Sequence, residues 1–151
     1  MLKLNNWWNE IAQSRNPDFI ICGEDGTPYM NRWWIVPRNE GANVYLHQIL
    51  KDDDERALHD HPWDSFSTVL EGTLREYTPN HPEGRVLRAG ETVQRLAKDA
   101  HRLEVIEPAF TLFSTGPRIR EWGFHCPNGW VHWQDFTKAE SPGEVGRGCG
   151  E

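Results

Sequence analysis

Apolar residues recur every three to four positions only near the start of the chain. This spacing places apolar side chains on one face of a helix, so a short helix is predicted over residues 4–15. The positions that keep the spacing are Leu4, Trp7 or Trp8, Ile11 and Ala12.

Beyond this segment the pattern changes to short apolar or alternating runs that are separated by turn residues. The first two runs, Phe19–Cys22 and Arg32–Val36, flank a turn signal that contains Asp25-Gly26 and Pro28. Regularly spaced short runs predict an antiparallel sandwich or barrel rather than alternating strands and helices. The further predicted strands are Asn43–Leu50, Ser65–Leu70, Thr73–Thr78, Arg85–Arg88, Glu91–Leu96, His101–Val105, Phe110–Ser114, Ile119–Phe124 and Trp130–Phe136.

Composition adds that the chain forms a single globular unit. Its 151 residues are 37% hydrophobic and 26% charged, which is the balance of an ordinary domain with one core. We expect an N-terminal helix and strand arm over residues 1–30 and a β-barrel core over 31–138. The last stretch, 139–151, is rich in glycine and is predicted to be a flexible tail.

Charge and targeting signals narrow the expected partners. The net charge of −7 disfavours nucleic acid and anionic membranes as partners, because both attract basic surfaces. No apolar run is as long as a membrane span, and the first residues lack a signal-peptide pattern, so a cytoplasmic protein is expected. The three cysteines form no Cys-x-x-Cys pair and are therefore predicted to be free thiols. They are Cys22, Cys126 and Cys149.

Three histidines carry the strongest chemical signal. His59 and His61 flank Asp60, and alternation along a strand points both rings to one face while Asp60 points away. His101, from a later predicted strand, can complete a set of three nitrogen ligands. Imidazole suits iron, zinc, copper and nickel and is poorly matched to magnesium or calcium. The pattern therefore predicts a transition-metal site.

The spacing of these histidines resembles the two motifs of the cupin superfamily. His59, His61 and Gly72 fall in register with the first motif, and Gly90 and His101 with the second. Other motif positions differ: Asp53 and Ser65 replace the Gly and Glu of the first motif, and Leu96, Lys98 and Val105 replace the Pro, Gly and Asn of the second. The resemblance implies an all-β jelly-roll barrel (a double-stranded β-helix) with the metal in its wide mouth. It also implies a homodimer built from paired edge strands.

The family's usual fourth ligand is the Glu whose position Ser65 occupies here. In one interpretation only the three histidines bind the metal, as in the iron thiol dioxygenases of the superfamily, and coordination positions stay open. In a second, Asp64 becomes a fourth ligand. In a third, the site holds no metal. We favour a hydrogen bond from Asp64 to a ligand ring, and we keep Asp64 and Ser65 as catalytic candidates.

Late strands commonly line the mouth of a cupin, so the resemblance points to a pocket wall there. Arg118 and Arg120 share one strand face and are predicted to clamp a substrate carboxylate or phosphate, unless that strand is a solvated edge. Trp63 and Trp122 are expected to exclude water from the metal. The other predicted lining residues are Tyr45, His47 and His125.

These expectations favour a non-haem Fe(II) dioxygenase that acts on a small molecule. The alternative is a metal-assisted isomerase, lyase or hydrolase that uses zinc, manganese or nickel as a Lewis acid. A cupin that only binds a small ligand is the third alternative.

Overall fold

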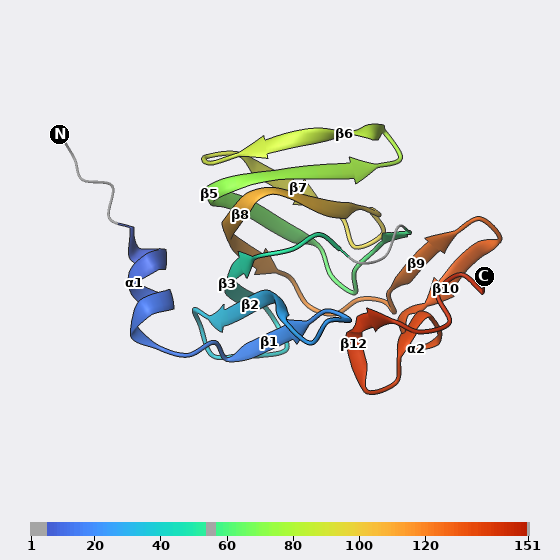
Figure 1. Cartoon of the computed structure of the whole chain (residues 1–151), viewed down its shortest axis with the longest axis horizontal. Coiled ribbons are helices and arrows are strands. Elements are labelled where there is room, and N and C mark those ends of the chain that lie inside the picture. The colour runs from blue at the N-terminus through green and yellow to red at the C-terminus, as the bar shows by residue number, and fades with distance from the viewer. Residues whose placement is uncertain (1–5, 54–56, 151) are drawn as a thin grey trace.

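The structure, a computed structural model, describes residues 6–53 and 57–150. Strands dominate it, as predicted, and one short helix, α1 (Trp7–Ser14), precedes them. Helix α1 and the hairpin of β9 (Gly123–Cys126) and β10 (Gly129–His132) lie at opposite ends of the molecule (Figure 1). The main sheet lies between these two ends.

Seven antiparallel strands form the main sheet, in the order β1-β2-β3-β8-β5-β6, with β7 paired to β5. The sheet therefore brings early and late parts of the chain together, with β3 next to β8. Its strands are β1 (Phe19–Cys22), β2 (Pro28–Trp34), β3 (Asn43–Ile49), β5 (Ser65–Thr78), β6 (His81–Arg88), β7 (Thr92–Arg95) and β8 (Arg102–Thr115).

Two pairs of predicted strands merge into the long strands β5 and β8. Their pairing shifts register repeatedly, between Val69 and Glu71 and again near Thr73, so bulges bend the strands without ending them. Gly72 lies at this bend with φ +84°, and a Cβ there would come within 2.2 Å of the Pro108 carbonyl oxygen. Glycine is therefore required at this position. The sequence pattern suggested a turn here, but the structure has a bend within a continuous strand.

Two smaller sheets lie beside the main one. The short strand β4 (Leu58–His59) pairs with β9, which pairs with β10. The predicted strand Trp130–Phe136 is divided, because its second half forms the one-turn helix α2 (Trp133–Phe136). The chain then closes with the pair β11 (Thr137–Lys138) and β12 (Ser141–Val145).

The apolar core has two parts. One is a cluster of side chains that the strands of the main sheet contribute: Ile49, Val69, Leu74, Leu87, Val93 and Ala109. The second gathers around Trp33, Leu46 and Phe110, and the apolar face of α1 packs on it. The apolar face that the spacing predicts for α1 thus covers this second cluster. The helix residues in contact with it are Trp7, Trp8, Ile11 and Ala12.

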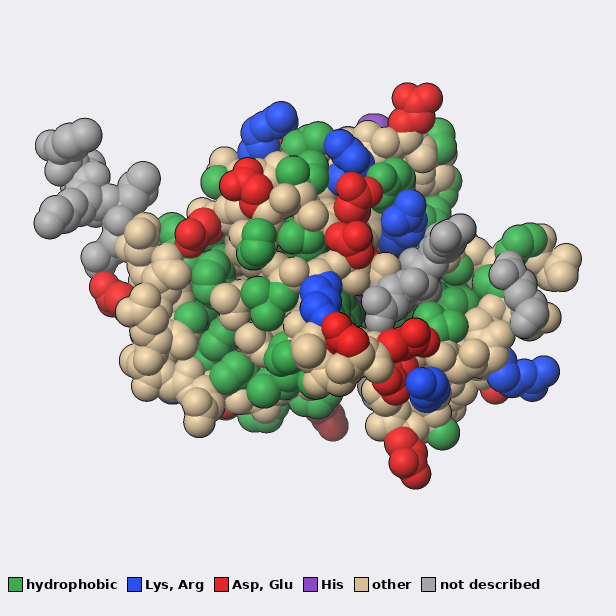
Figure 2. Space-filling model, in the orientation of Figure 1, with side chains coloured by type: hydrophobic (Ala, Val, Ile, Leu, Met, Phe, Trp, Pro, Cys, Tyr) green, Lys and Arg blue, Asp and Glu red, His purple; other side chains and the backbone are tan. Residues whose placement is uncertain are grey.

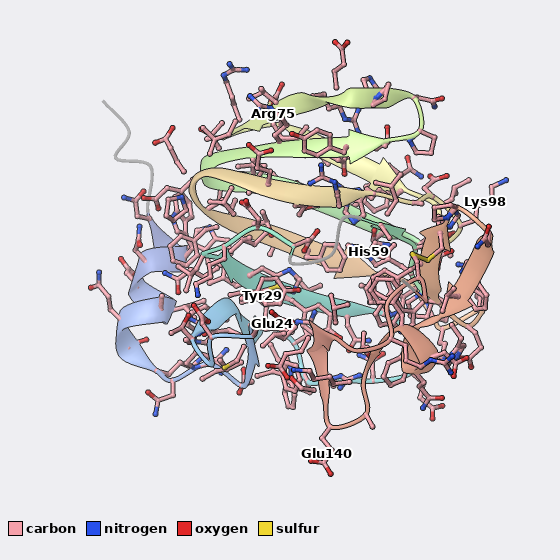
Figure 3. All side chains as sticks on the ribbon, turned by 45° about the vertical axis from the view of Figure 1, so that its right-hand side comes forward. Glu24, Tyr29, His59, Arg75, Lys98 and Glu140 are labelled. Atoms are coloured by element: carbon pink, nitrogen blue, oxygen red, sulfur yellow. A yellow bond between two sulfur atoms is a disulfide. The ribbon has the colours of Figure 1, made fainter. Side chains whose placement is uncertain are left out.

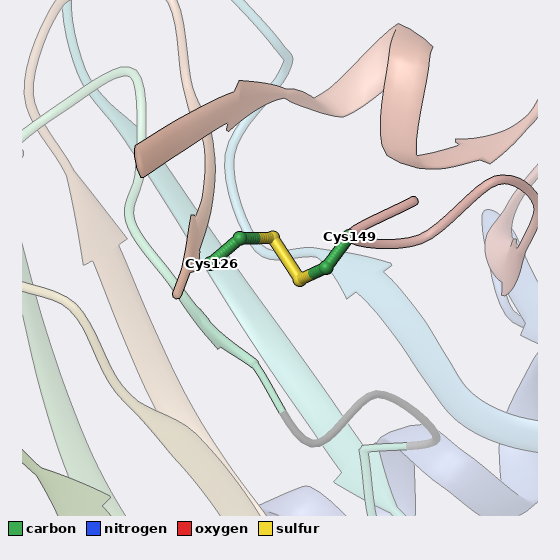
Figure 4. The surroundings of a disulfide bond; sticks show 2 residues. All are labelled: Cys126 and Cys149. Atoms are coloured by element: carbon green, nitrogen blue, oxygen red, sulfur yellow. A yellow bond between two sulfur atoms is a disulfide. The ribbon is translucent and has the colours of Figure 1, made fainter. Parts of the chain in front are cut away.

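The prediction of three free thiols is wrong for two of them. Cys126 at the end of β9 and Cys149 form a disulfide, and Cys22 is the free cysteine (Figure 4). Strand β12 and hydrogen bonds from Gly146 and Gly148 to the Phe136 carbonyl return the chain toward β9, a return that cysteine spacing does not reveal. In the chain-entropy view such a loop adds about 3 kcal/mol of stability. Disulfides persist mainly in oxidising compartments, so this bond does not support the expected cytoplasmic location.

Two features of the surface bear on the expected partners. On the face shown in Figure 2, acidic and basic side chains are interspersed among hydrophobic ones. None of the helices in the described part of the chain is long and apolar enough to cross a membrane.

Candidate metal centre

Backbone pairing brings the first and last of the three histidines together. His59 and His101 form an isolated antiparallel bridge, and each donates its backbone N–H to the other's carbonyl, at 2.9 and 3.0 Å. His61 is held next to them by a 3.0 Å bond from its N–H to the Ala97 carbonyl. The positions of all three rings are therefore fixed by the backbone and not only by side-chain packing.

The three rings form a nearly equilateral triangle. Their centroids are 4.9 Å apart for His59 and His101, 5.0 Å for His61 and His101, and 5.1 Å for His59 and His61. Each ring offers a nitrogen, and these three atoms lie within 4.8 Å of one another. Nitrogen atoms at this separation can bind one transition-metal ion.

A buried carboxylate orients one of the rings. Nδ1 of His101 lies 2.7 Å from Oε2 of Glu76, whose side chain is fully buried on β5. A charged carboxylate can only accept a hydrogen bond, so Nδ1 of His101 must carry the hydrogen. Nε2 of the same ring then keeps its lone pair for a metal. Glu76 is therefore part of the site although it is not in the metal-ligand group.

Two arginines hold Glu76 in its charged form. Arg85 donates to Oε1 from Nε at 3.0 Å and from Nη2 at 2.7 Å, and Arg95 donates from both Nε and Nη2 to Oε2. Burial alone would raise the pKa of Glu76, but the His101 bond and the Arg95 charge hold it well below its usual range.

The rings of His61 and His101 are neutral at physiological pH. Burial, with a contribution from the Arg95 charge, lowers the pKa of His101 to about 3 although Glu76 opposes the shift. Burial and the neighbouring His101 and His59 also lower the pKa of His61 well below its usual value. Neutral imidazole is the metal-binding form, so no proton competes with a cation at these two rings near neutrality.

One buried atom gives an independent test of whether a cation fits. Nδ1 of His61 is buried and makes no hydrogen bond with any described residue. Native structures rarely leave a buried polar atom unsatisfied unless an ion or an ordered water completes it. The donor set and this atom are therefore consistent with a bound transition metal.

The histidines open into a cavity of about 300 Å³. Its aromatic wall includes Trp63, which stacks on His61 at 5.2 Å, and Trp122, whose ring lies 6.4 Å from that of His59. Figure 3 shows the labelled His59 near the middle of the molecule. The wall on the β2, β3 and β8 side is formed by Tyr29, Met30, Arg32, His47, Ile49, Leu103, Thr111 and Phe113.

Asp64 and Ser65 take structural positions instead of the predicted catalytic ones. Oδ1 of Asp64 accepts the N–H of Ala97 at 2.7 Å, and its carbonyl accepts that of Gly116 at 3.0 Å. Asp64 thus fixes the loops on either side of the site and contacts no ligand ring. Ser65 is buried on β5, outside the cavity lining.

The carboxylate of Asp60, which alternation turns away from the three rings, is buried in the protein. Its side chain is 1% exposed, because the sheet of β4, β9 and β10 covers it. It accepts bonds from the Gly123 N–H at 2.8 Å, His125 at 2.9 Å and Trp130 at 3.0 Å. Burial raises the pKa of Asp60, but these bonds and one from Arg120 outweigh it and keep the carboxyl charged.

The late arginines lie outside the cavity and bond to other groups of the protein. Arg120 places Nη1 2.9 Å from Oδ1 of Asp60 and 3.3 Å from the carbonyls of His61 and Ala97. Arg118 is exposed and pairs with Glu121 at 2.9 Å. Neither arginine lines the cavity. Strand β9 begins only at Gly123, so both arginines lie before it in an irregular segment and not on the strand face that was predicted.

The remaining predicted pocket residues divide between two sides of the molecule. His47 lines the cavity, and Tyr45 lies behind it, buried and stacked on the His47 ring at 5.8 Å. His125 bonds Asp60 and faces a separate surface pocket near Lys98 and Arg85. His125 therefore lies outside the cavity lining, although His101 lines both this pocket and the cavity.

Replacing Arg120 by alanine is expected to destabilise the fold rather than weaken substrate binding selectively. The change leaves the buried Asp60 carboxylate short of one charged donor, which costs roughly 1–3 kcal/mol. Denaturant unfolding of the metal-free variant measures this loss. Arg118→Ala is the matched control, and its exposed pair contributes less than about 0.5 kcal/mol. Equal stability of the two variants would contradict the assigned role of Arg120.

Two residues of the site were missed by sequence reasoning. Glu76 had a signal, because alternation along β5 places it on the same face as the buried Leu74. Arg32 had none, since an arginine beside two tryptophans in a predicted strand is equally typical of an exposed face.

Comparison with known proteins supports the fold. No family model and no curated protein matches the sequence. Among solved structures, a putative mannose-6-phosphate isomerase from Ralstonia eutropha is similar, with a TM-score of 0.53 and 19% identity, over 66% of this chain and 92% of that one. A cupin-2 domain containing protein from Shewanella frigidimarina has a TM-score of 0.51 and 17% identity, over 76% and 95%. An RmlC-like cupin from the same organism has a TM-score of 0.50 and 18% identity, over 59% and 77%.

Proposed function

This chain is a cupin by fold, and we propose that it is a metal-dependent enzyme whose metal is held by His59, His61 and His101. The observation that carries the proposal is the convergence of three imidazole nitrogens within 4.8 Å of one another. They converge at a cavity of about 300 Å³, which suits a small-molecule substrate.

Within this class we propose a non-haem Fe(II) dioxygenase. Its support is the ligand group, which in the described part of the chain contains three imidazoles and no carboxylate. Three protein ligands leave positions open for both a substrate and dioxygen, and a bound ferrous ion would supply the activation of dioxygen.

The chain's own residues would prepare the site for this chemistry. Glu76 fixes the tautomer and orientation of His101, and Arg95 keeps Glu76 charged. Trp63 and Phe113, in edge contact at 5.4 Å, form an apolar wall of the cavity together with Leu103. Such a wall limits the access of water to a bound substrate.

Oxygen consumption tests the dioxygenase. Protein reconstituted anaerobically with ferrous iron is expected to consume oxygen with at least one member of a panel of small thiols, amino acids and diketones. The zinc-loaded protein and iron-treated His61→Ala protein should stay at background. Iron-loaded protein that converts a substrate equally well without oxygen would contradict the dioxygenase and favour a metal-assisted isomerase or lyase. Protein that binds no metal would contradict the enzyme itself and favour a ligand-binding cupin.

A further inference from the structure

Arg32 is a charged group in the cavity wall that has no acidic partner among the described residues. It lies on β2 directly across from His47 on β3, and its Nε donates to Nε2 of His47 at 2.9 Å. Its guanidinium carbon lies 4.7 Å from the centre of the Tyr45 ring. The terminal nitrogens Nη1 and Nη2 make no hydrogen bond with any described residue, although Arg32 lines the cavity.

The other arginine of the cavity shows the contrast. Arg95 is buried, and its charge is matched by the Glu76 carboxylate at its Nε and Nη2. Among the described acidic residues of the cavity wall only Asp53 remains, and its Oδ2 accepts the N–H of Leu103 at 2.7 Å. The wall beside the histidines therefore holds one arginine, Arg32, that has no described carboxylate in hydrogen-bond contact.

This arrangement costs stability and is unfavourable without a ligand. Burial lowers the pKa of Arg32, and the neighbouring Tyr45 ring offsets this only in part. His47, which accepts from Arg32, is held neutral by burial and by that same charge, so it cannot act as a counter-ion. An anionic ligand would satisfy the terminal nitrogens and balance the charge.

We propose that Arg32 is the anion-binding group of this cavity and that the substrate is a small molecule with a carboxylate. The planar guanidinium presents two terminal nitrogens side by side, which matches the two oxygens of a carboxylate. The volume of about 300 Å³ fits a compact organic acid. The aromatic surface of Trp63 and Phe113 would contact its apolar part. The statement that this ligand is a substrate depends on the proposed enzyme, whereas the anion site itself does not.

Binding to metal-free protein tests the anion site separately from the enzyme. Metal is removed with 1,10-phenanthroline, a neutral chelator, so that neither a metal nor a bound chelator can contribute. Acetate, pyruvate and benzoate are then titrated, each beside its neutral amide, with calorimetry and with the fluorescence of the cavity tryptophans as readouts. At least one acid should bind about 10- to 100-fold more tightly than its amide, and Arg32→Gln should abolish this difference.

Two controls separate binding from folding. Arg118→Gln removes an exposed arginine that is paired with Glu121, and it should retain the preference for the acid. Arg32→Gln should unfold at the same denaturant concentration as the wild type or at a higher one, because it removes an unmatched charge. The proposal is overturned if no acid is preferred over its amide, if Arg32→Gln keeps the preference, or if inorganic phosphate binds more tightly than every acid. Failure of oxygen consumption with intact acid binding would overturn only the dioxygenase.

Discussion

Replacing His61 by alanine is expected to reduce the affinity for a divalent transition metal by at least about 100-fold while the fold is preserved. Loss of a group that only orients a ligand already costs 10- to 100-fold in affinity, so loss of a ligand should cost more. The ring of His61 faces two other imidazoles and the cavity, and not the apolar core formed around Leu74 and Leu46. Competition titration with a chromogenic chelator gives the affinity, and circular dichroism checks the fold.

His81 provides the matched control for this change. It lies on β6 as an exposed histidine outside the three-histidine group, with its backbone and ring near Thr78. His81→Ala should keep wild-type affinity and stoichiometry. If His61→Ala and His81→Ala bind metal equally well, the three-histidine centre is contradicted.

Replacing Glu76 by glutamine is expected to cost about 3–5 kcal/mol of stability in the metal-free protein. The amide is nearly isosteric, so little volume is lost, but the buried Arg95 is left without a counter-ion. The same change removes the carboxylate that fixes the His101 tautomer, so metal affinity should also fall by about 10- to 100-fold. Denaturant unfolding and metal titration measure the two effects.

Glu104 provides the comparison for Glu76. It also receives bonds from an arginine, Arg75 at 3.2 Å, and from Tyr77 at 2.5 Å, but its side chain is 32% exposed. Glu104→Gln should therefore cost less than about 1 kcal/mol and leave metal affinity unchanged. Glu76→Gln protein as stable as Glu104→Gln protein would show that the buried network does not have the role assigned here.

The three-histidine group could be predicted because local geometry decides it. Alternation along a strand places His59 and His61 on one face, and a third histidine on a later strand needs only the antiparallel pairing that brings it alongside. The structure supplies this pairing as the bridge between His59 and His101. The β-rich architecture followed from the spacing of the apolar runs in the same way.

The surroundings of the ligands depend on contacts that no local pattern contains. Alternation correctly turned Asp60 away from the metal, but only the second sheet, through Gly123 and Trp130, makes that direction buried. Cys126 and Cys149 are separated by 23 residues, and their pairing depends on how the chain returns after α2. Arg120 similarly contacts Asp60 and the His61 carbonyl across about 60 residues of chain. In each case the contact joins parts of the chain that are distant in the sequence.

X-ray absorption at the metal edge of zinc-loaded protein tests the central claim most directly. The account predicts one zinc per chain with a nitrogen shell at about 2.0–2.1 Å and the outer-shell scattering of three imidazole rings. Imidazole scattering should fall by one ring in His101→Ala protein that is loaded at high zinc concentration. A zinc surrounded only by oxygen, or the same three-ring signal without His101, would contradict the three-histidine centre.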